Sequence, residues 1–110
     1  MSKLSYEFTR AITRAPSASI VHGLRALDTG TPDLTRMLSA HRDYINALGE
    51  AGLAVTELAE LEEFPDSVFV EDTALCLPEG AVLMRPGAAT RGGEVAHMAP
   101  ALRRFYTEVR

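Results

Sequence analysis

Three carboxylates, Asp66, Glu71 and Asp72, lie in and beside a short run of residues that favours a β-strand, Ser67–Val70. Carboxylates at the end of a strand are well suited to bind a guanidinium, whose planar fork of N–H donors matches carboxylate oxygens. Arg91, which follows a Pro-Gly turn, could bind the carboxylate of a ligand in the same way. The residue types favour such a ligand site and an ordinary turn with an exposed arginine equally.

The acidic residues are concentrated in the central part of the chain. The 110 residues include 15 acidic and 11 basic ones, for a formal net charge of −4, which argues against nucleic acid as the partner. Segment 43–84 contains no Lys or Arg, and its acidic residues are Asp43, Glu50, Glu57, Glu60, Glu62, Glu63, Asp66, Glu71, Asp72 and Glu79. Solvated loops and helix ends are one interpretation of this stretch, and an electronegative wall facing a cationic ligand is the other.

The residues that could serve as nucleophile, base or metal ligand form no recognisable motif. The single cysteine, Cys76, lies in an apolar run, where we expect a small buried side chain. His41 and His97 fall in expected helices and are interpreted as packing or helix-surface residues, while a functional role for His22, in a loop, stays open. The sequence lacks HExxH, P-loop and GxGxxG patterns, and the spacing of its possible ligands gives no support for a metal site.

Length and hydropathy limit the class of protein further. A chain of 110 residues suffices for one ordinary domain and not for two. No apolar run approaches the ~18 residues that a membrane span needs, and the first residues contain no apolar signal core. We therefore expect a cytoplasmic protein without a membrane partner.

Two segments have helical periodicity, and β-forming runs alternate with them. Residues 32–51 carry one apolar stripe, with Thr31 as the expected N-cap and Gly52 as a left-handed stop. Residues 95–106 repeat the spacing, although Pro100 should kink or split that helix. The expected strands are Phe8–Ile12, Ala54–Leu58, Ser67–Val70, Thr73–Leu77 and Ala81–Met84, the last two forming a hairpin. This order predicts an α/β or α+β chain.

The stretch Pro65–Ala74 (Pro-Asp-Ser-Val-Phe-Val-Glu-Asp-Thr-Ala) resembles the signature of the dimethylarginine dimethylaminohydrolase family, within the guanidino-group-modifying superfamily. Arg85–Ala88 and the following Arg91 continue the match at the right distance. Ala40–Tyr44 and Arg104–Tyr106 also agree with the family. The resemblance covers the chain from about residue 8 to its last few residues.

This resemblance implies a fold and a reaction. The fold is a five-bladed α/β propeller of ββαβ-type modules, the pentein fold, of which this chain would supply roughly two modules. The reaction is the hydrolysis of methylated arginine to citrulline and a methylamine. In the family a cysteine thiolate attacks the guanidinium carbon and a histidine acts as general acid and base, without metal or organic cofactor.

The resemblance also implies roles for residues that would contact the cationic groups of the substrate. Asp66 would bind the α-amino group, and Asp72 would bind the guanidinium nitrogens. Glu71 would help to orient this carboxylate cluster. Leu24, in a lid loop over the pocket, would offer its backbone carbonyl to the amino group.

The remaining implied contacts concern the stem and the acidic end of the substrate. Phe69 would pack against the alkyl stem, and Arg91 would pair with the α-carboxylate. The catalytic histidine and cysteine of the family come later in the chain than the part matched here, and His22 and Cys76 are not in matching positions.

We therefore expect residues 1–110 to form the N-terminal portion of such a propeller, with no catalytic residue. Alone it should be inactive, and a C-terminal segment or self-association would have to close the propeller. Pro100 departs from the family, which runs a helix through this position. Two alternatives remain open: a non-catalytic module that binds an arginine-like ligand or oligomerises, and part of an arginine deiminase or amidinotransferase relative.

Overall fold

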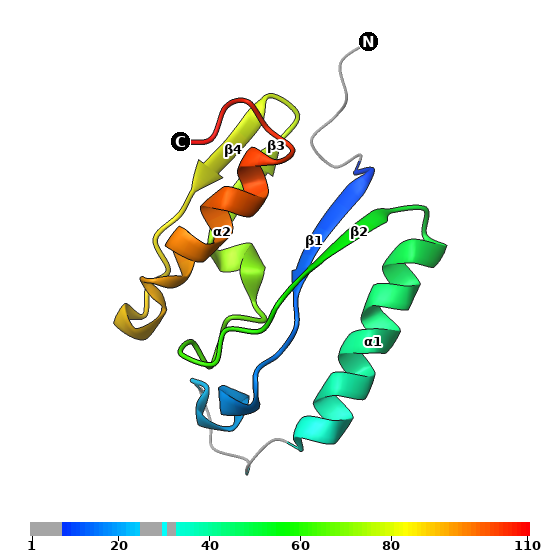
Figure 1. Cartoon of the computed structure of the whole chain (residues 1–110), viewed down its shortest axis with the longest axis vertical. Coiled ribbons are helices and arrows are strands. Elements are labelled where there is room, and N and C mark those ends of the chain that lie inside the picture. Colours follow the sequence, from blue (N-terminus) through cyan, green and yellow to red (C-terminus); the bar gives the residue numbers. More distant parts are fainter. Residues whose placement is uncertain (1–7, 25–29, 31–32) are drawn as a thin grey trace. The chain divides into compact units, whose positions relative to one another are not determined.

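Two parallel strands, β1 (Arg10–Arg14) and β2 (Ala54–Leu58), form the first sheet of the computed structural model, which describes residues 8–24, 30 and 33–110. Parallel strands need a crossover connection, and the helix α1 (Leu34–Glu50) lies in it and packs beside β2 (Figure 1). The chain divides into two compact units, and these three elements belong to the unit formed by residues 9–68. The other unit contains residues 69–110.

Strand β1 lies slightly further along the chain than the predicted Phe8–Ile12. Thr13 and Arg14 are buried and extend the strand, because their side chains find acceptors beside it. The Thr13 hydroxyl donates to the carbonyl of Thr56 (3.3 Å), and Arg14 Nη1 donates to the carbonyl of Ala59 (2.7 Å). The strand ends before Pro16, which has no N–H to continue the ladder. The prediction for β2 is confirmed at both ends.

Both ends of α1 are defined by capping groups. Asp33, rather than the predicted Thr31, is the N-cap, and its carboxylate accepts a backbone N–H of the first turn at 3.2 Å; Thr31 itself lies outside the described residues. At the other end Gly52 has a φ of +95°, and the N–H of Leu53 donates to the carbonyl of Leu48 at 3.1 Å. This is a Schellman motif, so the predicted left-handed stop is confirmed.

The predicted strand Ser67–Val70 is wrong. Residues 65–68 form a turn, and Val70–Asp72 form a short 3-10 helix, η2. Pro65 and Asp66 favour a turn, and the N–H of Ser67 donates locally to the carbonyl of Phe64 at 3.0 Å. The carboxylates of this stretch are therefore presented by a turn and a helical turn, not by a pleated strand.

The second unit is built on the predicted hairpin, which is confirmed. Strands β3 (Ala74–Leu77) and β4 (Gly80–Leu83) pair antiparallel, and β4 also bridges to the last residues of the chain through Ala81 and Val109. Gly80 is needed there, because a Cβ on it would lie 2.7 Å from the carbonyl oxygen of Glu108.

Helix α2 (Glu94–Arg103) packs against β4 (Figure 1). Its buried side chains include Met98, Ala99, Ala101 and Leu102. Pro100 is exposed and does not split the helix, contrary to one form of the prediction. The helix ends at Arg103, earlier than the predicted residue 106. Just after its end, the N–H groups of Phe105 and Tyr106 both donate to the carbonyl of Leu102 (3.0 and 2.9 Å).

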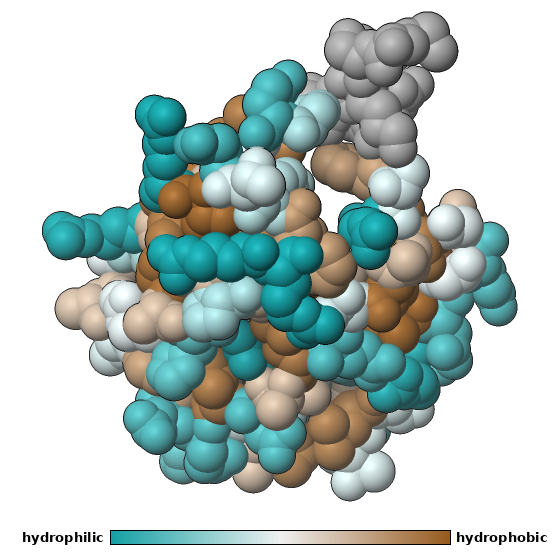
Figure 2. Space-filling view, turned by 45° about the horizontal axis from the view of Figure 1, so that its top comes forward, coloured by the Kyte–Doolittle hydropathy of each residue, from teal (hydrophilic) through white to brown (hydrophobic). Residues whose placement is uncertain are grey.

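Large hydrophobic side chains also reach the surface. On the face shown in Figure 2, hydrophobic residues are interspersed with hydrophilic ones. In the hairpin, Leu75 and Val82 face each other in the register and are both exposed, as is Met84 just after β4. This side of the hairpin is therefore an apolar surface that its own unit leaves uncovered.

Titratable groups of α1 and β2 interact across the first unit. Arg42 forms a two-pronged, exposed ion pair with Glu57 (3.3 and 2.8 Å), and this hydrogen bonding lowers the pKa of Glu57. Nε2 of His41 is buried and has no hydrogen-bond partner among the described residues. Burial, and secondly the charge of Arg42, lower the pKa of His41 below its ordinary value of 6.5.

These contacts predict a pH dependence of stability. Because the folded-state pKa of His41 is lower than its unfolded value, the unfolded chain binds more protons as the pH falls through 6.5. The free energy of unfolding should therefore decrease on acidification, and His41→Leu should flatten this decrease relative to the wild type. Urea unfolding between about pH 5 and pH 8 measures it, with the exposed His22→Leu as control. Equal slopes for wild type and His41→Leu would contradict the assignment.

Candidate functional site

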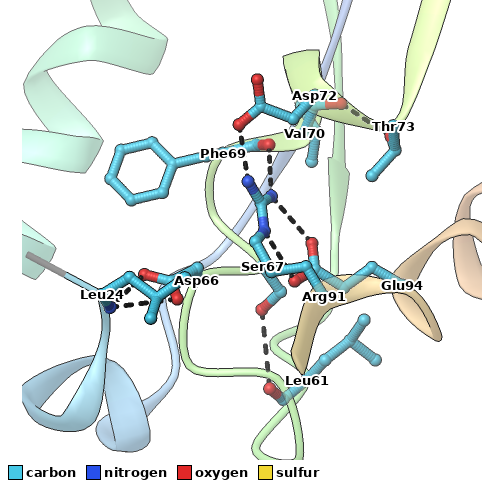
Figure 3. A network of polar contacts seen from close by, with 10 residues as sticks. All are labelled: Leu24, Leu61, Asp66, Ser67, Phe69, Val70, Asp72, Thr73, Arg91 and Glu94. Atoms are coloured by element: carbon cyan, nitrogen blue, oxygen red, sulfur yellow. Dashed lines mark hydrogen bonds and ion pairs between the residues drawn. The ribbon is translucent and has the colours of Figure 1, made fainter. Parts of the chain in front are cut away.

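The residues predicted to contact a ligand fall into two sets, each within one unit. Leu24 and Asp66 meet in the unit of residues 9–68, while Phe69, Asp72 and Arg91 meet in the unit of residues 69–110. Figure 3 shows the contacts within each set. Glu71 is exposed on η2, next to Asp72.

The first set joins a buried carboxylate to a loop. The Asp66 residue is only 7% exposed, and its two oxygens both accept the backbone N–H of Leu24, at 3.1 and 3.2 Å (Figure 3). The loop approaches through a short 3-10 helix, η1 (Ala18–His22), which ends at Gly23. The Leu24 side chain is 60% exposed. Asp66 thereby fixes the backbone of the loop and leaves the side chain of Leu24 at the surface.

Gly23 makes this close approach possible. A Cβ at this position would lie 2.6 Å from Oδ1 of Asp66 and 3.1 Å from the carbonyl oxygen of Ile20. The first distance would force the Asp66 carboxylate to shift, and the second is tighter than most contacts of a real Cβ. A glycine therefore lets the loop approach Asp66 closely enough for this contact, a role that no motif in the sequence indicated.

The second set is centred on the guanidinium of Arg91. Its side chain is only 8% exposed and makes four hydrogen bonds (Figure 3). Nε and Nη2 donate to the two carboxylate oxygens of Glu94, each at 2.9 Å. Nη2 also donates to the carbonyl of Phe69 (2.8 Å), and Nη1 donates to Asp72. The interpretation of Arg91 as an exposed residue is thus wrong.

Glu94 is the member of this set that the sequence did not reveal. Its side chain is 3% exposed, and it is the first residue of α2, where the positive end of the helix dipole favours a carboxylate. The spacing of three residues from Arg91 fits such a pair, but this pattern is too common in sequences to single out Glu94 by itself. The hydrogen bonds that Arg91 donates to Glu94 are the main reason that the pKa of Arg91 is raised, with Asp72 contributing less and burial opposing.

Asp72 differs from Glu94 in its access to solvent. Its side chain is 54% exposed, and the neighbouring Phe69 is 43% exposed. Asp72 therefore presents carboxylate oxygen to solvent while Arg91 holds it from inside. The exposed part of the set thus combines a carboxylate with a partly exposed aromatic residue three positions earlier in the chain, residue types that suit a cation on an alkyl stem.

Other candidate groups lie apart from these sets. Cys76 is exposed, so the expectation of a buried thiol is wrong. Burial and the thiol of Cys76 raise the pKa of Tyr106. Within the described part of the chain, no group of three or more His, Cys, Asp or Glu side chains is placed to hold a metal ion. No helix among these residues is long and apolar enough to cross a bilayer.

Two curated relatives of this chain carry the same enzyme name. No protein-family model matches the chain. An N(G),N(G)-dimethylarginine dimethylaminohydrolase of Pseudomonas aeruginosa is 42% identical over 90% of the chain, and one of Streptomyces coelicolor is 33% identical over 87%. The chain spans only 39% and 38% of these two relatives.

Solved structures agree with this similarity. The structure of a dimethylarginine dimethylaminohydrolase (DDAH) mutant from Pseudomonas aeruginosa, complexed with citrulline, superimposes on this chain with a TM-score of 0.90 at 40% identity. The superposition covers 94% of this chain and 42% of that one. A dimethylarginine dimethylaminohydrolase adduct with S-methyl-L-thiocitrulline gives the same TM-score and identity, over 94% of this chain and 41% of that one.

The close approach at Gly23 gives a test of the first set. Gly23→Ala should push the Asp66 carboxylate away from the Leu24 N–H and lower the free energy of unfolding by about 1–3 kcal/mol, the cost of leaving a buried polar group unpaired. Gly49→Ala is the matched control, since Gly49 lies in α1 with open space around its Cα, and it should raise stability by about 0.5–1 kcal/mol. Urea unfolding measures both, and an unchanged midpoint for Gly23→Ala would refute the close contact.

Proposed function

We propose that this chain supplies substrate recognition to an enzyme, because it belongs to the dimethylarginine dimethylaminohydrolase family. It corresponds to an N-terminal part of such an enzyme, with a partial α/β fold of the pentein type. The complete enzyme would hydrolyse methylated arginine to citrulline and a methylamine, in the cytoplasm and without a cofactor. The observation that carries the proposal is the exposed Asp72 carboxylate held on the buried Arg91.

Asp72 and Phe69 would receive the cationic end of the substrate. A guanidinium binds carboxylate oxygens through two parallel N–H donors, and the half-exposed Asp72 has oxygen available to it. The exposed ring of Phe69 would pack on the methylene stem. Glu71, exposed on the same helical turn, would add negative charge and help to orient the carboxylate. These contacts recognise a positive charge at the end of an apolar chain.

Arg91 would bind the α-carboxylate of the same substrate. Three of its four hydrogen bonds go to the buried Glu94 and to the backbone of Phe69, while the fourth goes to the exposed Asp72. Asp72 is thus the partner that a ligand carboxylate can replace. A ligand with both charges would separate the Arg91–Asp72 pair, since it gives each side chain a new partner of opposite charge.

Asp66 and Leu24 would contact the α-amino group. Asp66 is buried and accepts from the Leu24 N–H, and the backbone carbonyl of Leu24 would be the further acceptor for the ammonium. Leu24 lies in a loop, as a lid residue would. Both groups are acceptors, as recognition of an ammonium requires.

Turnover would require a further segment that brings the nucleophilic cysteine and the acid–base histidine. Such a segment would also cover the apolar side of the hairpin at Leu75 and Val82. A non-catalytic module that binds the same ligand and self-associates is the alternative supported by this exposed surface. An arginine deiminase or amidinotransferase relative would differ in preferring arginine to its methylated form.

The catalytic part of the proposal predicts that the 110 residues alone form no citrulline from dimethylarginine. Adding the C-terminal remainder of a family member as a second chain should restore turnover, and comparing arginine with dimethylarginine as substrate would separate the related activities. A colorimetric citrulline assay measures both. Robust turnover by the chain alone would contradict the proposal that a further segment supplies the catalytic residues, and it would make Cys76 a candidate nucleophile.

The binding part predicts that Asp72→Ala weakens binding of dimethylarginine by about 10- to 100-fold, because a charge-assisted hydrogen bond contributes about 1.5–3 kcal/mol. Isothermal titration of the chain measures the Kd. Glu79→Ala, which removes an exposed carboxylate from the turn between β3 and β4, is the matched control and should bind as the wild type does. An unchanged Kd for Asp72→Ala would mean that this carboxylate is only a turn residue.

A further inference from the structure

Glu94 is the most completely enclosed charged group in the Arg91 set. Its side chain is 3% exposed, and each of its two carboxylate oxygens accepts one N–H of Arg91 at 2.9 Å. This bidentate geometry fixes the plane of the guanidinium as well as its position. A single hydrogen bond or a distant charge would leave the guanidinium free to rotate.

Because Glu94 occupies one edge of the guanidinium, it determines which N–H donors of Arg91 remain for other partners. Nε and one N–H of Nη2 face Glu94, so Nη1 and the second N–H of Nη2 face the opposite way. There they meet Asp72 and the backbone carbonyl of Phe69 (Figure 3). With Glu94 in this position, Nη1 of Arg91 is directed toward Asp72, the exposed carboxylate of the set.

The local fold holds Glu94 in place without the ligand. Arg91 closes a short 3-10 helix, η3 (Ala89–Arg91), and its N–H donates to the carbonyl of Ala88 at 3.0 Å. After two glycines, α2 begins at Glu94, so that both partners are held by helical backbone and lie three residues apart. The carboxylate also lies at the positive end of α2. The pair is thus pre-organised by the chain itself.

The two carboxylates on Arg91 differ in a way that suggests different tasks. Glu94, 3% exposed, compensates the buried positive charge permanently, whereas Asp72, 54% exposed, can leave without exposing an uncompensated buried cation. We propose that Glu94 is a positioning residue: it orients and neutralises Arg91, so that Asp72 can be exchanged for the carboxylate of a ligand. This inference rests on the proposed function in that Arg91 binds that carboxylate.

The test compares two ligands that differ only in the carboxylate. L-Citrulline carries it, and N-carbamoylputrescine, its decarboxylated analogue, does not. Glu94→Gln should weaken binding of L-citrulline by about 10-fold or more and leave the affinity for N-carbamoylputrescine unchanged within about 2-fold, because only the first ligand uses Arg91. NMR titration of the chain measures both affinities.

Glu57→Gln is the matched control. It also removes a carboxylate that binds an arginine with both oxygens, but that pair with Arg42 is exposed and lies outside the set. It should change neither affinity. Equal losses for both ligands in Glu94→Gln would show a purely structural role for Glu94, and no loss for either would show no role; both results overturn the inference.

Two further measurements keep the inference testable. If Glu94→Gln does not fold, Glu94→Asp keeps the charge but shortens the side chain, and it should show the same selective loss for L-citrulline. If the wild type binds neither ligand, the proposed function fails, while the positioning role is judged on the Nε–H proton of Arg91. Its exchange with solvent should be slow in the wild type and in Glu57→Gln, and at least about 10-fold faster in Glu94→Gln or Glu94→Asp. Unchanged exchange would overturn the inference.

Discussion

A buried guanidinium must be compensated, and this requirement organises the unit of residues 69–110. Arg91 is 8% exposed and keeps its charge under all ordinary conditions, so its neighbours have to supply acceptors and negative charge. Glu94 supplies both, and the carbonyl of Phe69 supplies a further acceptor. Removing one partner of such a buried pair generally costs about 3–5 kcal/mol. The same guanidinium joins the first residue of α2, Glu94, to Phe69, the residue before η2.

The compensation is asymmetric, and that asymmetry links structure to recognition. One carboxylate is enclosed and permanent, and the other is open to solvent. An arginine with two enclosed partners would be a structural element only, whereas one with an exchangeable partner can serve a ligand. Asp66 is a second buried carboxylate of this kind: both of its oxygens accept the backbone N–H of Leu24 in the neighbouring loop. In both places a buried charged residue orders the backbone around it, and we propose that it also contacts the ligand.

Sequence reasoning predicted the elements with strong local signals and missed what depends on tertiary contacts. Gly52 ends α1 as expected because a left-handed stop is a local property. The β-forming residues around Phe69 suggested a strand, but Pro65 and Asp66 turn the chain, and no partner strand lies beside it in the described residues. The family resemblance pointed to Asp72 and Arg91, yet burial of Arg91 by Glu94 arises only when η3 and α2 are formed. A glutamate three residues after an arginine is too common a pattern to indicate it.

The central claim is that Arg91 exchanges Asp72 for the carboxylate of an arginine-like ligand while Glu94 stays in place. A crystal structure of the chain with L-citrulline tests it most directly. We expect the ligand carboxylate on Nη1 of Arg91, the Asp72 carboxylate turned toward the ureido group, and both hydrogen bonds to Glu94 retained. A bound ligand that leaves the Arg91–Asp72 pair intact, or one that displaces Glu94 instead, would contradict it.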